Sequence, residues 1–219
     1  MTGLVRKATL LAVCGLMVMA ATALAGIPDP SKCTVPTFVD LVGTAVGTPD
    51  SRGTFTITVL DMNLNAVQNC QTILDFSACT ESRLCDDQLD TTKVVDCPTR
   101  TVRGFTNASG QITFTVIGAA RNAPPSVPGP GANCVYILAG GVSLGLATAV
   151  VYDQNGAITN NGLDLTDAIA VLRDWGSGLY FGRSDIDHDG LLGLTDAIKD
   201  LKAVGDGTSA NGCTTTYCP

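Results

Sequence analysis

The spacing of apolar side chains along the chain changes near residue 152. Between residues 54 and 60 hydroxyl and apolar side chains alternate, as in Thr56-Ile57-Thr58-Val59, which is the period of a strand with one buried face. The same pattern predicts strands at residues 67–76, 101–106, 111–116, 134–139 and 142–151. After residue 152 the apolar residues recur at helical spacing instead. The chain is therefore expected to fold as a β domain followed by a small helical domain.

Two turns are expected to connect neighbouring strands. Residues 107–110, which end in Gly110, predict a hairpin between residues 101–106 and 111–116. Gly140-Gly141 is expected to join residues 134–139 to residues 142–151. The segment 124–130 is rich in proline and glycine and cannot lie within a sheet. Short strands at such spacing favour an antiparallel sandwich.

A twelve-residue acidic segment begins at Asp185 and ends on the first turn of the second predicted helix. Short carboxylates at positions 1, 3, 5 and 12, with Gly190 at position 6 for the sharp turn, suit a calcium ion. Without a cation, four carboxylates in so short a loop would repel one another. The predicted ligands are the carboxylates of Asp185, Asp187, Asp189 and Asp196 and the backbone carbonyl of Leu191.

A less complete copy of this loop lies about thirty residues upstream. Counting twelve residues from Asp153 puts Ala157 at position 5 and leaves no glycine at position 6. Counting back from Asp167 instead puts Gly156 at position 1, and glycine has no side chain that could bind a metal. The count that begins at Asp153 is therefore favoured. Fewer carboxylates predict weak binding or an empty site. The expected ligands in this frame are Asp153, Asn155, Thr159, Asn161 and Asp164.

Apolar residues at helical spacing follow both loops, and below ~70–80 residues such a small core needs a metal or disulfides to hold it together. One predicted helix is expected to pack against the other through Leu165, Ile169, Leu172 and Trp175 on the first and Ile198, Leu201 and Val204 on the second.

This duplicated pair of loops, with aspartate at position 12, resembles the type I dockerin module of secreted bacterial proteins across residues 151–205. The resemblance implies an EF-hand-like calcium fold and a cohesin-like protein partner. Contacts with that partner would fall at the helix starts. Those positions are Leu194 and Thr195 in the second repeat and Gly162 and Leu163 in the first.

The strand segments 56–61 and 106–114, with the Gly-Val-Ser-Leu-Gly strand at 141–145, resemble bacterial immunoglobulin-like domains of the invasin and intimin kind. Together the two resemblances imply an all-β immunoglobulin-like sandwich (26–151), then a small α-helical dockerin-like or EF-hand-like domain (152–205) and a cysteine-containing tail (206–219). The chain departs from that pattern by an insert at 76–98. Its acidic residues favour a solvated loop held by two disulfides over a metal site; they are Asp86, Asp87, Asp90 and Asp96.

Residues 1–25 have the features of a secretory signal peptide. Arg6 and Lys7 precede an apolar run, which ends in Ala23-Leu24-Ala25. Cleavage there predicts a secreted or surface-exposed protein without membrane insertion. It also removes two basic residues and no acidic ones, which leaves 11 basic against 20 acidic residues. A net charge of −9 disfavours binding to nucleic acid or to anionic membranes.

Export agrees with the cysteine content. Beyond residue 25 the chain has eight cysteines, an even number that predicts four disulfides whose pairing the sequence leaves open. The cysteines are Cys33, Cys70, Cys79, Cys85, Cys97, Cys134, Cys213 and Cys218.

Catalysis is not expected. Ser143 lies in a Gly-x-Ser-x-Gly pattern, but that motif needs a helix after the serine and a histidine base. The residues after Ser143 have a strand pattern, and the single histidine, His188, lies in the calcium loop. Glu81 is the single glutamate and lies in the insert, so paired carboxylates for glycoside cleavage are not indicated.

Two functions therefore remain. In the first, a calcium-folded dockerin-like module docks the β domain onto a protein partner. In the alternative, a structural or adhesive surface protein, calcium only rigidifies the C-terminal domain and the β domain does the binding.

Overall fold

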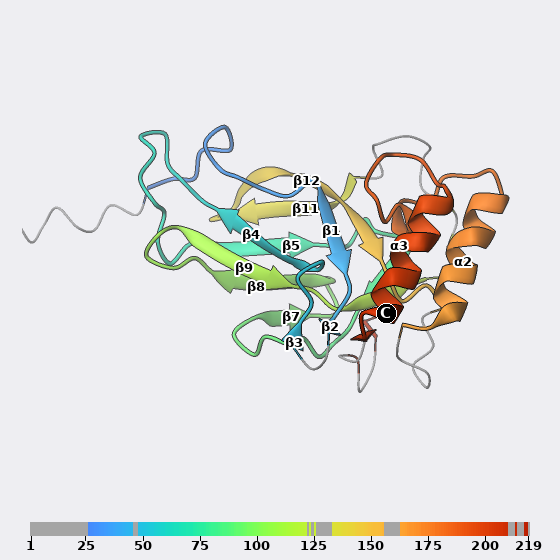
Figure 1. Cartoon of the computed structure of the whole chain (residues 1–219). Coiled ribbons are helices and arrows are strands. Elements are labelled where there is room, and N and C mark those ends of the chain that lie inside the picture. The colour runs from blue at the N-terminus through green and yellow to red at the C-terminus, as the bar shows by residue number, and fades with distance from the viewer. Residues whose placement is uncertain are drawn as a thin grey trace, which may run out of the picture.

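The computed structural model describes residues 26–45, 48–121, 123, 125, 133–155, 163–209, 213 and 217–218. Strands make up most of this structure, and two α-helices lie together at one end of the sheets (Figure 1). Strand β12 ends at Val151, and the first of the two helices begins at Leu165.

The principal sheet has six strands in the order β1-β12-β11-β5-β8-β7 and is curled (Figure 1). Strand β1 runs parallel to β12, and every other pair in this sheet is antiparallel. Its strands are β1 (Phe38–Leu41), β5 (Gln71–Asp75), β7 (Val94–Asp96), β8 (Thr101–Phe105), β11 (Asn133–Ala139) and β12 (Val142–Val151).

A separate pair, β4 (Thr54–Thr58) and β9 (Gln111–Thr115), packs on the principal sheet. Ile57 of β4 and Phe114 of β9 share one hydrophobic core with Leu74 of β5 and Ile137 of β11. The alternation of the sequence produces this arrangement, because the apolar residues of each strand point to the core. Short strands complete the β structure: β6 (Ser82–Leu84) pairs with β10 (Gly118–Ala120), and β2 (Thr44–Ala45) lies between β3 (Thr48–Pro49) and β13 (Thr208–Ser209).

The predicted immunoglobulin-like sandwich is wrong. The turn at residues 107–110 forms, but the strands on either side of it do not pair with each other: β8 pairs with β5 and β7, whereas β9 pairs with β4. The result is a curled mixed sheet covered by one strand pair, not two packed antiparallel sheets. Alternation fixes which face of a strand is buried but leaves its partner strand undetermined.

The second expected hairpin does form. Strands β11 and β12 are antiparallel neighbours across Gly140 and Gly141, whose φ angles are +55° and +81°. Two consecutive residues with positive φ are typical of the tight turns that match the twist of a β-hairpin.

The insert at residues 76–98 contributes β6 and β7, and three disulfides connect it to the rest of the chain. The bridges are Cys79–Cys134, Cys85–Cys213 and Cys97–Cys218. Cys33 and Cys70 are thiols, so three of the four predicted bridges are present. Disulfides persist in oxidising compartments and are compatible with an extracellular protein.

The two helices are α2 (Leu165–Gly176) and α3 (Leu194–Gly205), with the short 3-10 helix η3 (Gly182–Ser184) between them. A second hydrophobic cluster joins them to the sheet, because Val171 and Ala197 of the helices pack with Val42 and Val150. Among the described residues, no helix has the length and apolar character needed to cross a membrane.

The predicted packing between the helices is wrong in its choice of face. The buried residues of the two helices are small apolar residues and aspartates. The apolar ones are Ala168, Val171, Ala197 and Ala203. Most of the larger apolar residues that were expected in the helix core are exposed instead: Leu165, Ile169, Trp175, Ile198 and Leu201. Each helix has two apolar stripes, and periodicity does not indicate which stripe faces inward.

Candidate metal centre

The second loop brings three carboxylates together. One oxygen from each of Asp185, Asp187 and Asp189 lies within 4.8 Å of the other two. Calcium binds its oxygen ligands at about 2.3–2.6 Å, so oxygens that share one ion lie no more than about 5 Å apart. The side chains at positions 1, 3 and 5 therefore have the spacing that a calcium ion requires.

The backbone of the loop turns where the sequence predicts it. Gly190 at position 6 has a φ of +82° and His188 at position 4 a φ of +65°. The carboxylate of Asp185 accepts hydrogen bonds from the backbone N–H groups of Asp189 at 3.2 Å and Gly190 at 3.0 Å, and from the Tyr180 hydroxyl at 2.7 Å. These bonds hold the position 1 carboxylate at the inside of the loop.

Asp196, at position 12, lies on the first turn of α3 and is fully buried. Its two oxygens accept the N–H groups of Gly193 at 2.8 Å and Asp187 at 3.0 Å, so it joins the helix start to the loop. Leu191, at position 7, has an exposed aliphatic side chain without a ligand atom, so its backbone carbonyl is the group that could contribute to a metal site.

Burial makes the charges of this loop costly. It raises the pKa of Asp185 and Asp196 above the ordinary range, although their hydrogen bonds act in the opposite direction. The negative charges of neighbouring carboxylates raise both pKa values further. At Asp185 these neighbours are Asp189 and Asp187, and at Asp196 they are Asp187 and Asp185. A divalent cation would offset both effects, because its positive charge attracts each carboxylate and compensates the repulsion between them.

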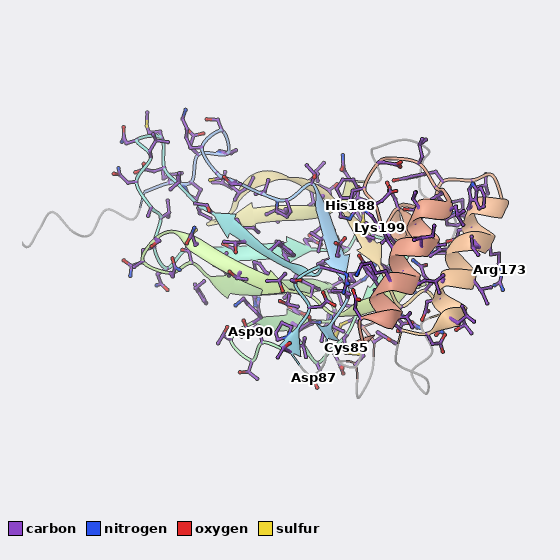
Figure 2. The ribbon with its side chains drawn as sticks, viewed as in Figure 1. Cys85, Asp87, Asp90, Arg173, His188 and Lys199 are labelled. Carbon is purple, nitrogen blue, oxygen red and sulfur yellow. A yellow bond between two sulfur atoms is a disulfide. The ribbon has the colours of Figure 1, made fainter. Side chains whose placement is uncertain are left out.

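His188 connects this loop to the sheet. Its ring stacks on Phe38 with centroids 4.2 Å apart, and its Nε2 lies 2.9 Å from a carboxylate oxygen of Asp40. Figure 2 shows His188 beside β1, close to Lys199 of α3. Sequence reasoning placed His188 in the loop but did not find this contact, since no local pattern relates residues 40 and 188.

The first loop has a different register from the favoured one. Asp164 is the N-cap of α2 and accepts the backbone N–H and the hydroxyl of Thr166. Asp167 is fully buried and accepts the N–H groups of Gln154 at 2.9 Å, Asn155 at 3.0 Å and Asp164 at 2.9 Å. These are the contacts that Asp196 makes in the second loop, so Asp167 occupies the corresponding position.

The start of the first loop is described as far as Asn155. Asp153 is fully buried, and its carboxylate accepts a hydrogen bond of 3.1 Å from the Tyr217 hydroxyl. The Asn155 side chain donates to the Thr166 hydroxyl at 2.9 Å. Thr159 and Asn161 lie outside the described residues. The helix starts are 29 residues apart, from Asp167 to Asp196, and this spacing is the sequence signal that the two aspartates correspond.

The same offset relates the exposed apolar residues of the helices. Leu165 and Leu194 are 60% and 54% exposed, and Ile169 and Ile198 are 45% and 54% exposed. Thr195, which was expected to contact a partner, is exposed like Leu194, whereas Leu163 is buried. Gly162 lies outside the described residues. When Asp167 is matched to Asp196, the residues that correspond to Leu194 and Thr195 are Leu165 and Thr166. The predicted pair of the first repeat therefore lies three residues too early.

The insert and the Gly-x-Ser-x-Gly segment have simpler roles. Cys85, Asp86 and Cys213 lie close together, but the two cysteines form a disulfide and offer no thiolate to a metal. Asp90 pairs with Lys93 at 2.8 Å, and Figure 2 shows Asp87 and Asp90 well apart from His188. Ser143 lies within β12, which continues as a strand to Val151.

Comparisons of the chain with protein-family models, with curated proteins and with solved structures found no match.

Proposed function

We propose that this chain is an exported calcium-binding protein whose helix pair docks onto a protein partner. The carboxylate cluster of Asp185, Asp187 and Asp189 supports the calcium part of this proposal. The signal-peptide pattern and the three disulfides support export. Bound calcium would order the second loop and thereby fix the start of α3.

The docking part of the proposal rests on one observation, the repeated apolar surface of the two helices. We call Leu165, Ile169, Leu194, Ile198 and Leu201 the helix-pair patch. All five are more than 40% exposed. Single exposed apolar side chains are ordinary, but here large ones are exposed at corresponding positions of both helices, which supports a role in an interaction. A partner of the cohesin type, as the dockerin-like loop pattern implies, would cover this patch.

A structural or adhesive role is the second candidate, and one observation favours it. The second loop is tied to β1 by the contacts of His188 with Phe38 and Asp40, and the helices share a core with Val42 and Val150. Calcium in that loop would stiffen the connection between the helices and the sheet. In this case the β domain would bind the partner.

Binding of the full chain to a panel of cohesin-type domains, with calcium and with chelator, tests the docking proposal. We expect binding in calcium that is lost in chelator and reduced at least tenfold by Leu194→Asp or Ile198→Asp. Met62→Asp is the matched control, because Met62 is 73% exposed on a loop far from the helices in sequence. Undiminished binding of both patch variants would contradict the role of the helix pair.

A further inference from the structure

Four arginines line one cleft of this acidic chain. The cleft has a volume of about 640 Å³, within the range of roughly 300–1,000 Å³ that is typical of small-molecule sites. Its walls come from the strand pair β6 and β10, from α2 and from η3. The arginines are Arg83, Arg121, Arg173 and Arg183.

The cleft concentrates positive charge in a chain that has little of it. After residue 25 there are seven arginines and 20 acidic residues with which they could pair. Four of these arginines lie in the cleft, and the described residues that line it include one carboxylate, that of Asp174. Four positive charges against one negative charge leave a net charge of +3 in the lining. Like charges repel one another, so a bound anion would be stabilised there.

Two of the arginines are held in place by contacts within the protein. The guanidinium group of Arg183 lies 4.4 Å from the centroid of the Phe181 ring. Its Nη2 donates to both carboxylate oxygens of Asp174, at 3.1 and 3.0 Å. The guanidinium group of Arg83 lies 4.2 Å from the centroid of the Tyr217 ring. Stacking on a ring fixes a guanidinium group in advance, which lowers the entropy that a ligand would have to remove.

The other two arginines have a fixed backbone and an exposed side chain. The backbone N–H of Arg121 donates to the carbonyl of Glu81 at 2.8 Å, and its own carbonyl accepts Nη1 of Arg183 at 3.2 Å. Arg173 lies in the last turn of α2. With the described residues, neither of these two exposed side chains forms a hydrogen bond or an ion pair. Both guanidinium groups can therefore bind an anion without first breaking a contact inside the protein.

The chemistry of the lining limits the kind of ligand. A guanidinium group offers parallel N–H donors that match two oxygens of a carboxylate or of a phosphate. The charge of the whole protein limits the size, because 11 basic against 20 acidic residues repel an extended polyanion. A small ligand with one anionic group experiences much less of this repulsion, which salt screens beyond about 8–10 Å.

We propose that this cleft binds a small organic anion, and that Arg121 and Arg173 hold its carboxylate or phosphate group. Arg83 and Arg183 add positive charge from their fixed positions in the wall. The inference goes beyond the proposed function and does not depend on it, because no residue of the second loop or of the helix-pair patch lines the cleft.

Calorimetric titration of the full chain with glucose 6-phosphate, glucuronate and glucose tests this proposal, with the free calcium concentration held constant. The three probes share a sugar ring and differ in the anionic group. We expect at least one of the two anions to bind, with one molecule per chain, and glucose not to bind. Binding of one anion alone identifies its charged group as the one that the cleft accepts. Binding of neither anion would overturn the proposal.

Substitutions place the bound anion in the cleft. Arg121→Gln combined with Arg173→Gln should weaken anion binding at least tenfold, because both N–H forks are lost. Lys32→Gln combined with Arg103→Gln is the matched control, since it removes the same charge from two residues that do not line the cleft. Undiminished binding in the first variant, or an equal loss in the control, would show that the cleft is not the site.

The outcomes distinguish this inference from the proposed function. A chain that binds calcium but neither anion contradicts the anion site alone. A chain that binds an anion but no calcium contradicts only the calcium part of the proposed function.

Discussion

At the scale of single residues, aspartates of similar sequence context have different roles. Asp164 caps a helix, whereas Asp167 accepts three backbone N–H groups from within the protein. The two residues are three apart, and each can be counted as the last residue of the first loop. Only the contacts with Gln154 and Asn155, which close the loop, distinguish them.

Substitution should separate these roles. We expect Asp164→Ala to lower the stability by about 1 kcal/mol, the usual effect of losing an N-cap. Asp167→Ala leaves three N–H groups without an acceptor and should cost about 2–4 kcal/mol. Thermal melts with and without calcium measure both effects. Equal losses in the two variants would contradict the register derived from Asp167.

The two thiols provide a second prediction at this scale. Cys70 belongs to the main hydrophobic core and Cys33 packs against that core. Burial raises the pKa of Cys70, and the charge of Cys33 adds to the increase. We expect oxidised glutathione to join them in a fourth disulfide. A thiol count after unfolding should fall from two to zero, with a mass loss of two hydrogens. Mixed disulfides with glutathione on both cysteines would contradict this.

The rate of that oxidation should depend on pH in a defined direction. Thiolate is the reactive form, and a raised pKa means that little of it is present near pH 7. The rate should therefore increase as the pH rises from 7 towards 9. Stopped time points analysed by mass spectrometry give the rate, and Cys33→Ser is the control that removes the partner thiol. A rate independent of pH would contradict a reaction that depends on the thiolate of Cys70.

At the scale of elements, local pattern predicts strands and helices better than it predicts what they pack against. Strands β4, β8 and β9 lie close to their predicted positions, yet β8 and β9 belong to different sheets. The turn between them closes tightly. Gly110 has a φ of +70°, and a Cβ at this residue would lie 2.5 Å from the carbonyl oxygen of Val59.

Gly110→Ala is therefore expected to destabilise the protein by about 1–3 kcal/mol, through the positive φ and the clash with the Val59 carbonyl. Gly176→Ala is the matched control. Gly176 ends α2, and an added Cβ there meets nothing within 4 Å, so this change should be neutral or stabilising by up to about 1 kcal/mol. Urea unfolding measures both. Equal midpoints for the two variants would contradict the tight turn.

At the scale of the whole molecule, the helices and the sheet support each other. Val42, Val150 and Tyr152 lie in one cluster with Leu163, Val171 and Ala203. Arg52 forms an ion pair with Asp206 after α3, and two disulfides hold Cys213 and Cys218 against the insert. A boundary near residue 152 stays a prediction, but the packing across it is extensive.

This packing has a measurable consequence for the isolated helical fragment, residues 151–219. In millimolar calcium we expect it to become helical but to melt at a lower temperature than the same helices in the full chain, because the sheet no longer covers their inner face. Circular dichroism and Trp175 fluorescence follow the two forms. Adding residues 26–150 as a separate fragment should restore part of the loss. A fragment that melts like the full chain would show that the sheet contributes nothing.

The sequence by itself determined the features that depend on near neighbours along the chain. These are the strands that alternate, the glycine hairpin between β11 and β12, the two helices and the acidic loop from Asp185 to Asp196. Each follows from residues within about a dozen positions, whose spacing alone sets the backbone conformation and the side chains that can meet.

Only the tertiary structure decided which partner each element has. It separated β8 from β9 and turned most of the large apolar residues of both helices outward. These outcomes depend on contacts between residues far apart in the chain. Several pairings satisfy the same local pattern, and the choice between them follows from how the whole set of apolar surfaces can be buried at once.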